Sequence, residues 1–495
     1  MPAISIPAPV GGWNASDALD RMPATDAVRM VNMIPRTSFV QTRRGYMIHC
    51  AGLGGSVETL AAWRGPAADR LIAAANGNLW NVSTSTPASL GSGFASNRWQ
   101  VFNHTGRLIL CNGVSTPQVY NGTTLTAISA TGPTVTTLWA GNSFKGRAFY
   151  WAQNAQSVWY AAAGSFQGAL NEFTFGPFLT TGGSLVQMLN WTNDGGDGVD
   201  DYAVFVFSTG EVLVYQGDDP GNVNAWALIG RFQIGEPLGP RAHAKVGGTE
   251  IILTRDGYVD LSVALRDGRY SERSAYSSKI IRAAKDAARD VGMFDGWEAV
   301  LYPAGQQFIV NVPTSNASAI QHVRETSSGG WCEFTNMRAR AFAVFRDRLY
   351  FGDPDGNVFL ADEDDNDNGA NIFSLCIPAF NSLGSRANRK QLTAAAAVTD
   401  YQLPSGIALD GLADFNLTLR ATVIEGTAQS PGFWDVSDWD TTDWGQQGDT
   451  LPTTQPFRNL SAIGYSLTVA VRINQRAQNV RWYATNIVFR QAGVV

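Results

Sequence analysis

An acidic run near residue 365 comes nearest to a metal-binding motif. Asp364, Asn366 and Asn368 alternate along the chain like the first oxygen ligands of a calcium-binding loop. The twelfth position of that loop is Leu375, where calcium needs a bidentate Glu, and no helical pattern flanks the run. The donor set is incomplete, so we expect a solvated acidic linker here, no catalytic metal and no resident cofactor.

A second group of chemically useful residues is the stretch PGFWDVSDWDTTDWG, at 431–445. Trp434, Trp439 and Trp444 recur every five residues, with Asp side chains between them. Indole rings can stack on sugar rings while carboxylates bind the hydroxyl groups, which would suit a glycan site. Large aromatic residues also anchor protein interfaces. We favour the anchor and expect these three residues to lie at an interface.

Signatures of catalysis are mostly missing from the sequence. The four His residues are scattered, and neither a G-x-S-x-G elbow nor an H-E-x-x-H motif is present. Gly141 and Gly146 have the spacing of a phosphate loop, but Arg147 replaces the Lys, so a β-turn is favoured. A glycosidase carboxylate pair needs only proximity in the fold, and the sequence leaves it open. We expect no enzyme and no catalytic residues.

The elements that would hold these residues are short β-hairpins repeated along the chain. Apolar residues alternate around turn glycines at positions 77, 113, 210, 257 and 356, most clearly in AFAVFRDRLYFGDPDGNVFLAD at 341–362. The intervals of 36, 97, 47 and 99 residues correspond to one or two units of roughly 40 to 50 residues, the period of a four-stranded propeller blade. The pattern predicts a mainly β protein containing a β-propeller of six or seven blades.

Composition agrees with many tight turns between aromatic-rich strands. The chain of 495 residues has 51 Gly, 25 Phe, 15 Trp and 14 Tyr. Its net charge of −6 argues against a protein that grips nucleic-acid phosphates, although DNA could still slide past it. The four Cys are far apart and are expected to be small buried hydrophobes. We expect neither a signal peptide nor a membrane span.

Changes in pattern along the chain suggest three parts. Residues 1–50 are broken by prolines and resemble an arm laid over another surface. Residues 51–370 carry the hairpins and, at 277–291, an Ala-rich helix expected on the flank of the β-domain. Residues 371–495 contain longer alternating runs at 416–424, 465–473 and 480–489, which predict an antiparallel, sandwich-like β-domain.

Several short motifs in a fixed order resemble one protein family. They are VNMIP at 31–35, RRGY at 43–46, LAAW at 60–63, LIAAANGNLW at 71–80, SKIIR at 278–282, WCEF at 331–334 and RLYFG at 348–352. Their order resembles that in the tail nozzle, or hub, proteins of short-tailed bacteriophages (podoviruses), also labelled packaged-DNA stabilisation proteins and related in role to tail tubular protein B. The similarity spans about residues 8 to 375.

The resemblance implies a virion protein of the short tail, made in the bacterial host cytoplasm. It implies a homohexamer that forms a ring below the head-tail adaptor (connector) and continues the DNA channel. The ring would retain the packaged genome, gate its ejection, and contact tail fibres or spikes and tail tip or ejection proteins. Double-stranded DNA would pass through the lumen without sequence specificity. We expect interface residues in the arm, at Trp13, Asn32, Pro35, Arg43 and Arg44.

Two other functions are compatible with parts of the sequence. A glycan-binding or glycan-degrading propeller would use the Trp/Asp stretch as its platform, but the Asp-box pattern of sialidase propellers is missing. An intracellular scaffold propeller would need WD-type repeats, of which only Trp434-Asp435 is present. The arm motifs favour the ring over both.

Overall fold

The computed structural model describes residues 2–65, 68–194, 199–267, 271–400, 407–419, 453–475 and 480–491. The described chain is mainly β and divides into two compact units. One consists of residues 48–321 and 336–360, and the other of residues 1–47, 322–335 and 361–495. Among the described residues, no helix has the length and apolar character needed to cross a membrane.

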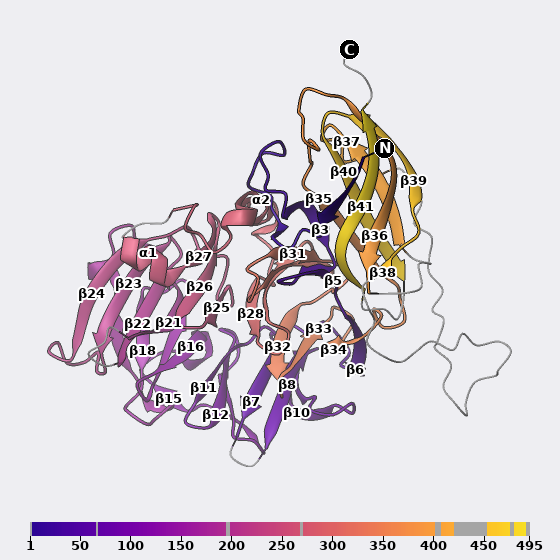
Figure 1. The fold of residues 1–495 in the computed structure, drawn as a ribbon. Helices are drawn as coiled ribbons and strands as arrows, with labels where there is room; N and C mark the ends of the chain where they lie inside the picture. The colour runs from indigo at the N-terminus through magenta and orange to yellow at the C-terminus, as the bar shows by residue number, and fades with distance from the viewer. Residues whose placement is uncertain are drawn as a thin grey trace. The chain divides into compact units, whose positions relative to one another are not determined.

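The first unit is a β-propeller whose sheets follow one another in chain order (Figure 1). Each of its first four sheets is an antiparallel meander of four strands. The first comprises β7 (Thr59–Arg64), β8 (Asp69–Ala75), β9 (Asn78–Asn81) and β10 (Ala88–Ser92), and the second β11 (Gln100–His104), β12 (Arg107–Cys111), β13 (Gln118–Tyr120) and β14 (Leu125–Ala127). The third comprises β16 (Leu138–Phe144), β17 (Arg147–Ala152), β18 (Ser157–Tyr160) and β20 (Asn171–Thr174), and the fourth β21 (Leu185–Asp194), β22 (Val199–Phe207), β23 (Glu211–Gly217) and β24 (Trp226–Gln233).

Three further sheets complete the propeller. The fifth comprises β25 (His243–Val246), β26 (Thr249–Thr254) and β27 (Gly257–Asp260), and the sixth β28 (Glu298–Tyr302), β29 (Gln307–Pro313) and the start of β30 (Ala319–Glu325). The seventh comprises β32 (Ala341–Phe345), β33 (Arg348–Gly352), β34 (Val358–Asp364) and β6 (Gly45–Cys50). Because β32 packs beside β7, the ring closes, and the choice between six and seven blades resolves to seven.

Short elements fill the connections between blades. Two short strands pair in parallel, β15 (Ala130–Thr131) and β19 (Gly168–Ala169), and two 3-10 turns are η1 (Val135–Thr137) and η2 (Gly176–Phe178). The expected helix is present as η3 (Ser278–Ile280) followed by α2 (Ile281–Val291), with Ile281, Ala284 and Ala288 buried. It packs on β27 and β29, as predicted for a flanking helix. A shorter helix, α1 (Leu261–Asp267), was not predicted.

The turn glycines occupy the predicted chain reversals. Asn76 and Gly77 have φ of 51° and 70°, the left-handed pair that a two-residue hairpin between β8 and β9 needs. Gly141 and Gly146 both lie in the hairpin formed by β16 and β17, so the β-turn interpretation is confirmed. The predicted hairpin at 341–362 contains an additional tight turn at Arg346-Asp347, with φ of 51° and 59°.

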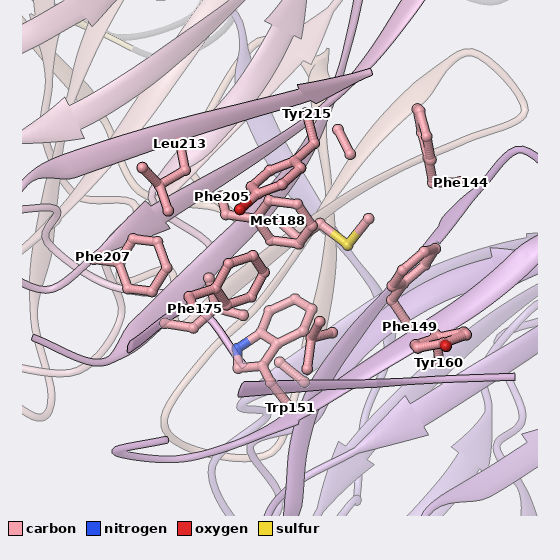
Figure 2. Close-up of a cluster of buried hydrophobic side chains, with 14 of the residues drawn as sticks. Phe144, Phe149, Trp151, Tyr160, Phe175, Met188, Phe205, Phe207, Leu213 and Tyr215 are labelled. Carbon is pink, nitrogen blue, oxygen red and sulfur yellow. The ribbon is translucent and has the colours of Figure 1, made fainter. Parts of the chain in front are cut away.

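Aromatic side chains fill the space between the third and fourth blades. Phe205 and Tyr215 face Phe175, and Trp151 lies at the edge of the same cluster (Figure 2). The rings of Phe175 and Phe205 have centroids 4.5 Å apart. All four Cys residues are buried free thiols, as predicted, and Cys111 belongs to the core between the second and third blades. The propeller is therefore held by apolar packing between neighbouring blades.

The second unit is a sandwich of two sheets. The first sheet runs β38 (Thr453–Thr454), β36 (Lys390–Thr399), β41 (Arg481–Gln491), β5 (Val40–Thr42) and β4 (Met33–Pro35), with β1 (Ala3–Pro7) beside β41 and β39 (Arg458–Gly464) beside β36. The second runs β31 (Trp331–Phe334), β2 (Gly12–Trp13), β3 (Asp26–Val31), β35 (Ile372–Pro378), β40 (Leu467–Gln475) and β37 (Ile407–Ala413). The predicted sandwich is thus confirmed, although the strand that pairs with β40 at its edge, β37, lies at 407–413, and residues 416–419 of the expected run form no strand.

The predicted division into arm, propeller and C-terminal domain needs correction. The strands of residues 2–44 belong to the sandwich, because Ala3–Pro7 pairs with residues 484–488 of β41 and β3 pairs with β35. The predicted boundaries after residues 50 and 370 become boundaries after residues 47 and 360, and residues 322–335 also join the sandwich. The prolines that suggested an arm sit at strand ends and turns, where a missing N–H costs no ladder hydrogen bond.

Candidate functional site

One cavity of the propeller lies where the first strands of six blades converge. It measures about 240 Å³. Its walls come from β7, β11, β16, β17, β21, β25 and β28, and from the residues just before β25. The lining residues used below are Gln100, Trp151, Gln187, Arg241 and Glu298. Central cavities formed by many strands are common ligand sites in β-structures.

Arg241 crosses this cavity and ties distant blades together. It precedes β25 of the fifth blade, yet its Nη1 donates to the carbonyl of Glu58 at 2.9 Å and its Nη2 to Thr59 Oγ1 at 2.8 Å, both in the first blade. Its Nη2 also donates to the carbonyl of Trp99 at 2.7 Å, and its Nε to Gln100 Oε1 at 3.2 Å. The guanidinium is therefore engaged in hydrogen bonds that connect the fifth blade to the first and second blades.

Burial and charge oppose each other at Glu298 and Arg241. Burial lowers the pKa of Arg241 to about 10, and the nearby Glu298 carboxylate opposes that change. Burial raises the pKa of Glu298, while Arg241 and the backbone N–H of Phe342, which donates at 3.1 Å, lower it again. The arginine is still protonated at neutral pH, and its charge favours the ionised form of Glu298 against the effect of burial.

The side chains that line the cavity are of the kinds that bind polar molecules. Among the described residues that line it, Glu298 is the one carboxylate, whereas a glycosidase of the usual kind uses two. The amides of Gln100, Gln187 and Asn142 supply neutral donors and acceptors. These side chains suit recognition of a polar molecule more than acid-base cleavage.

Several of the predicted interface residues meet in the sandwich as one buried network. Arg43 forms a bidentate ion pair with Asp367, Nη1 to Oδ1 at 2.8 Å and Nη2 to Oδ2 at 2.6 Å. Its Nε donates to Asn32 Oδ1 at 2.8 Å, and Asn32 Nδ2 donates to Thr335 Oγ1 at 2.8 Å. We call these four residues the Arg43 network. The VNMIP, RRGY and WCEF segments therefore converge around it, although they are far apart in sequence.

Burial within the chain corrects the interface interpretation for three residues. Asn32 is 0% exposed, Arg43 is 3% exposed, and Pro35 is also buried. Asn32 has a φ of 52°, which its short polar side chain tolerates, and its amide satisfies the neighbouring strands. These residues stabilise the sandwich from inside, and they offer no surface to a neighbouring subunit.

Two other predicted residues have partly exposed positions. Trp13 is partly buried and packs edge-to-face against His322, with ring centroids 5.5 Å apart. Arg44 is exposed and lies 3.9 Å from the Asp365 carboxylate. Trp434, Trp439 and Trp444 lie outside the described residues.

The acidic run closes on itself by hydrogen bonds. The Asp364 carboxylate accepts from the N–H of Asp365 at 2.7 Å and from Asn366 Nδ2 at 3.1 Å, and Asn366 Oδ1 accepts from the N–H of Gly369. Asn368 donates its backbone N–H to the carbonyl of Tyr46 at 2.7 Å. Within the described part of the chain, no group of three or more His, Cys, Asp or Glu is placed to hold a metal. The oxygens of this run act as turn caps.

Several exposed apolar side chains of the described sandwich lie on two neighbouring segments. They lie on or beside β39 and on the segment that follows β37, and we call them the β39 patch: Phe415 (36% exposed), Leu417 (42%), Phe457 (53%), Ile463 (44%) and Tyr465 (45%). Asp414 links the two segments by accepting from the N–H groups of Tyr465 at 2.7 Å and Ser466 at 3.0 Å. In the described chain β39 has a strand partner on one side only, β36. Such exposed apolar groups are typical of an interaction surface.

The cavity residues and the β39 patch were not predicted as sites from sequence. Gln187 and Gln100 interrupt or begin apolar strand patterns, and a glutamine at an inward position is a usable signal for a polar cavity. Arg241 follows Pro240 in a connecting segment, where nothing local indicates that it reaches another blade. Leu460, Ala462 and Gly464 occupy every second position of this segment, which is typical of a strand. The pattern does not show that the apolar side chain of Ile463, between two of them, is exposed.

Comparisons with known proteins give structural similarity alone. No protein-family model matches this sequence, and no curated protein matches it. Among solved structures, the chain is similar to YCF48 from Cyanidioschyzon merolae, with 10% identity over 64% of this chain and 98% of that one and a TM-score of 0.40. It is also similar to BBS1N, solved in complex with ARL6DN, with 9% identity over 65% and 98% of the two chains and a TM-score of 0.40. The computationally designed Ika8 protein gives 9% identity over 67% and 96%, with a TM-score of 0.37. At these identities and TM-scores the similarities say nothing about function.

Proposed function

We propose that this protein is a structural virion protein, the tail nozzle or hub of a short-tailed bacteriophage. Copies of the chain would close a hexameric ring below the head-tail adaptor and continue the DNA channel. The ring would retain the packaged genome and gate its ejection into the host. The proposal starts from the ordered sequence motifs, and the chain would act by assembly, without catalysis.

The observation that carries the proposal is the β39 patch. A cyclic ring needs heterologous contacts, in which one surface of a subunit fits a different surface of the next. Partly exposed large apolar groups beside an edge strand are the kind of surface that such contacts bury. The Arg43 network supports the proposal of a ring. The VNMIP, RRGY and WCEF motifs would then serve to build the sandwich that presents the β39 patch.

The bracing of the propeller cavity bears on where DNA would pass. Arg241 binds the first and second blades from the fifth, so the centre of the propeller is spanned by side-chain hydrogen bonds. The DNA lumen of the proposed ring would therefore lie between subunits. A net charge of −6 is suitable for such a lumen, because a strongly basic wall would hold the phosphates and slow ejection.

The test is the copy number of this chain in virus particles. Density-purified particles from the source lysate are digested, and labelled reference peptides of this chain and of the portal are quantified by mass spectrometry. We expect about one copy for every two portal subunits, as a six-fold ring on a twelve-fold portal requires. Absence from the particles would contradict the proposal and favour a glycan-binding protein. A release assay with host polysaccharide would then decide between binding and cleavage.

A further inference from the structure

Two glutamines of the propeller cavity each have one amide atom without a hydrogen-bond partner among the described residues. Gln187 donates through Nε2 to the carbonyl of Gly239 at 2.6 Å, which fixes the amide and leaves Oε1 as an unpartnered acceptor. Gln100 accepts from Arg241 through Oε1, which leaves Nε2 as an unpartnered donor. Gln187 is 1% exposed and Gln100 is 6% exposed, so bulk water does not solvate them freely.

Trp151 adds a third group of this kind to the same cavity. Its indole is 3% exposed, and its Nε1–H has no acceptor within the described part of the chain. Each buried polar group without a partner costs about 1–3 kcal/mol, and such groups are rare in native proteins. Three of them lining one cavity indicate that the cavity holds something that bonds to them.

The charges of the cavity point to a neutral occupant. Arg241 already makes four hydrogen bonds to protein acceptors, so it has little left to offer an anion. Arg241 repels a cation, and the carboxyl group of Glu298 adds no positive charge that would attract an anion. A neutral ligand must then accept from Gln100 and Trp151 and donate to Gln187. Hydroxyl groups do both, and Glu298 can accept from a further hydroxyl.

Size limits the occupant to a small molecule. Sites for drug-sized ligands measure roughly 300–1,000 Å³. The cavity, at about 240 Å³, lies just below that range. Phe102 and Trp151 also line it and supply an apolar wall on which the C–H face of a sugar ring can lie.

We propose that the propeller cavity binds one neutral polyhydroxylated molecule, of the size of a monosaccharide or a cyclitol. Gln100 and Trp151 act as donors to it, Gln187 and Glu298 as acceptors. The site is separate from the β39 patch, and the inference does not depend on the proposed function in the virion.

Binding is measured on the full-length protein by saturation-transfer difference NMR titration. D-Glucose and myo-inositol are the neutral probes, and glucose 6-phosphate and glucosamine are their charged counterparts. We expect at least one neutral probe to bind saturably and both charged probes to bind more weakly. Thermal melting of every variant checks that it is folded.

Two matched pairs of variants locate the site. Trp151→Phe removes the indole N–H at the cavity, and Trp226→Phe removes another buried, unpartnered indole N–H of the same core cluster that does not line the cavity. Gln187→Leu removes the cavity amide, and Gln156→Leu removes an amide that likewise donates to a backbone carbonyl, that of Gly183 at 2.8 Å. We expect Trp151→Phe and Gln187→Leu to weaken binding about five-fold each, the loss of one hydrogen bond, and the two controls to change it little. No saturable binding by either neutral probe, or equal weakening by both members of each pair, would overturn the proposal and leave water as the occupant.

Discussion

At the residue scale, Arg43 shows how a charged side chain can serve the interior of a sandwich. Its guanidinium faces the carboxylate of Asp367, the amide oxygen of Asn32, and the carbonyls of Arg44 and Thr335, at distances of 2.6 to 3.1 Å. Both members of the ion pair have side chains 2% exposed. With every donor satisfied, the desolvation cost of the two charges is offset only while both are present.

We predict that Arg43→Met destabilises the sandwich by about 3–5 kcal/mol, because it leaves Asp367 buried and uncompensated. Urea unfolding followed by intrinsic fluorescence measures the loss. Arg44→Met is the matched control, since Arg44 is exposed and its ion pair with Asp365 spans 3.9 Å.

A double-mutant cycle separates the ion pair from general packing. Arg43→Met combined with Asp367→Leu should destabilise by clearly less than the sum of the single changes. Additive effects would mean that the two side chains do not stabilise each other.

His322 gives the sandwich a dependence on pH. The residue is 2% exposed, and burial lowers its pKa to about 4. In the unfolded chain its pKa is about 6.5, so between pH 6.5 and 4 the unfolded state binds a proton that the folded state does not. The free energy of unfolding therefore falls as the pH falls through this window, by roughly 3 kcal/mol in total.

We predict that His322→Gln flattens this dependence. Wild type and variant are compared by urea unfolding at pH 7, 5.5 and 4.5, and the difference between them should shrink as the pH falls. Curves that stay parallel at all three pH values would show that His322 does not carry the effect.

Residue types alone did not reveal which motif residues are buried. Arg43 and Arg44 are adjacent and chemically identical, yet one lies in the core and the other on the surface. The difference depends on Asp367, which is 324 positions away. An interaction between residues so far apart produces no local pattern in the sequence, so it could not be predicted. The same is true of Arg241 and its acceptors in the first blade.

At the element scale, the hairpins were predictable because their turns need unusual backbone angles. Most residues with positive φ at these turns are Gly or Asn, and these residue types can be recognised directly in the sequence. The Arg346-Asp347 turn breaks that rule, with two residues in the left-handed region that both carry full side chains. It costs stability relative to a Gly-containing turn.

We predict that Asp347→Gly stabilises the propeller by up to about 1 kcal/mol, because glycine adopts the φ of 59° without steric strain. The reverse change at an equivalent turn is the control. Gly146→Asp, at a φ of 74° with open space around it, should destabilise by a similar amount. Thermal melting of both variants is the measurement, and a loss of stability in Asp347→Gly would refute the turn argument.

Strand pairing at the sandwich was far less predictable than the hairpins. Alternating apolar residues identified β40 and β41, but the pairing of Ala3 with Val488 joins opposite ends of the sequence. A turn fixes the register of a hairpin, whereas nothing in the sequence between these strands fixes theirs. Short segments such as residues 3–7 therefore read as an irregular arm until their partner is known.

At the scale of the whole molecule, the β39 patch is where assembly can be disturbed without disturbing the fold. We predict that Ile463→Lys leaves the melting temperature nearly unchanged, because the side chain is 44% exposed, and prevents incorporation into particles. Complementation of a phage that lacks this chain measures incorporation. Ile229→Lys is the control, since Ile229 is 47% exposed on the propeller strand β24. Full incorporation of Ile463→Lys would place the contact surface elsewhere.

The pairing of β1 with β41 also determines when the sandwich can be completed during synthesis of the chain. A ribosome adds roughly 5–20 residues per second, so the strand at 481–491 emerges roughly half a minute to a minute and a half after the strand at 3–7. During that interval the intervening propeller can fold, while Met30, Val31 and Ile34, which end in the core, await their partners. A nascent or truncated chain without β41 therefore cannot complete the sandwich or present a finished β39 patch. Only subunits whose translation has passed β41 would be competent to join a ring.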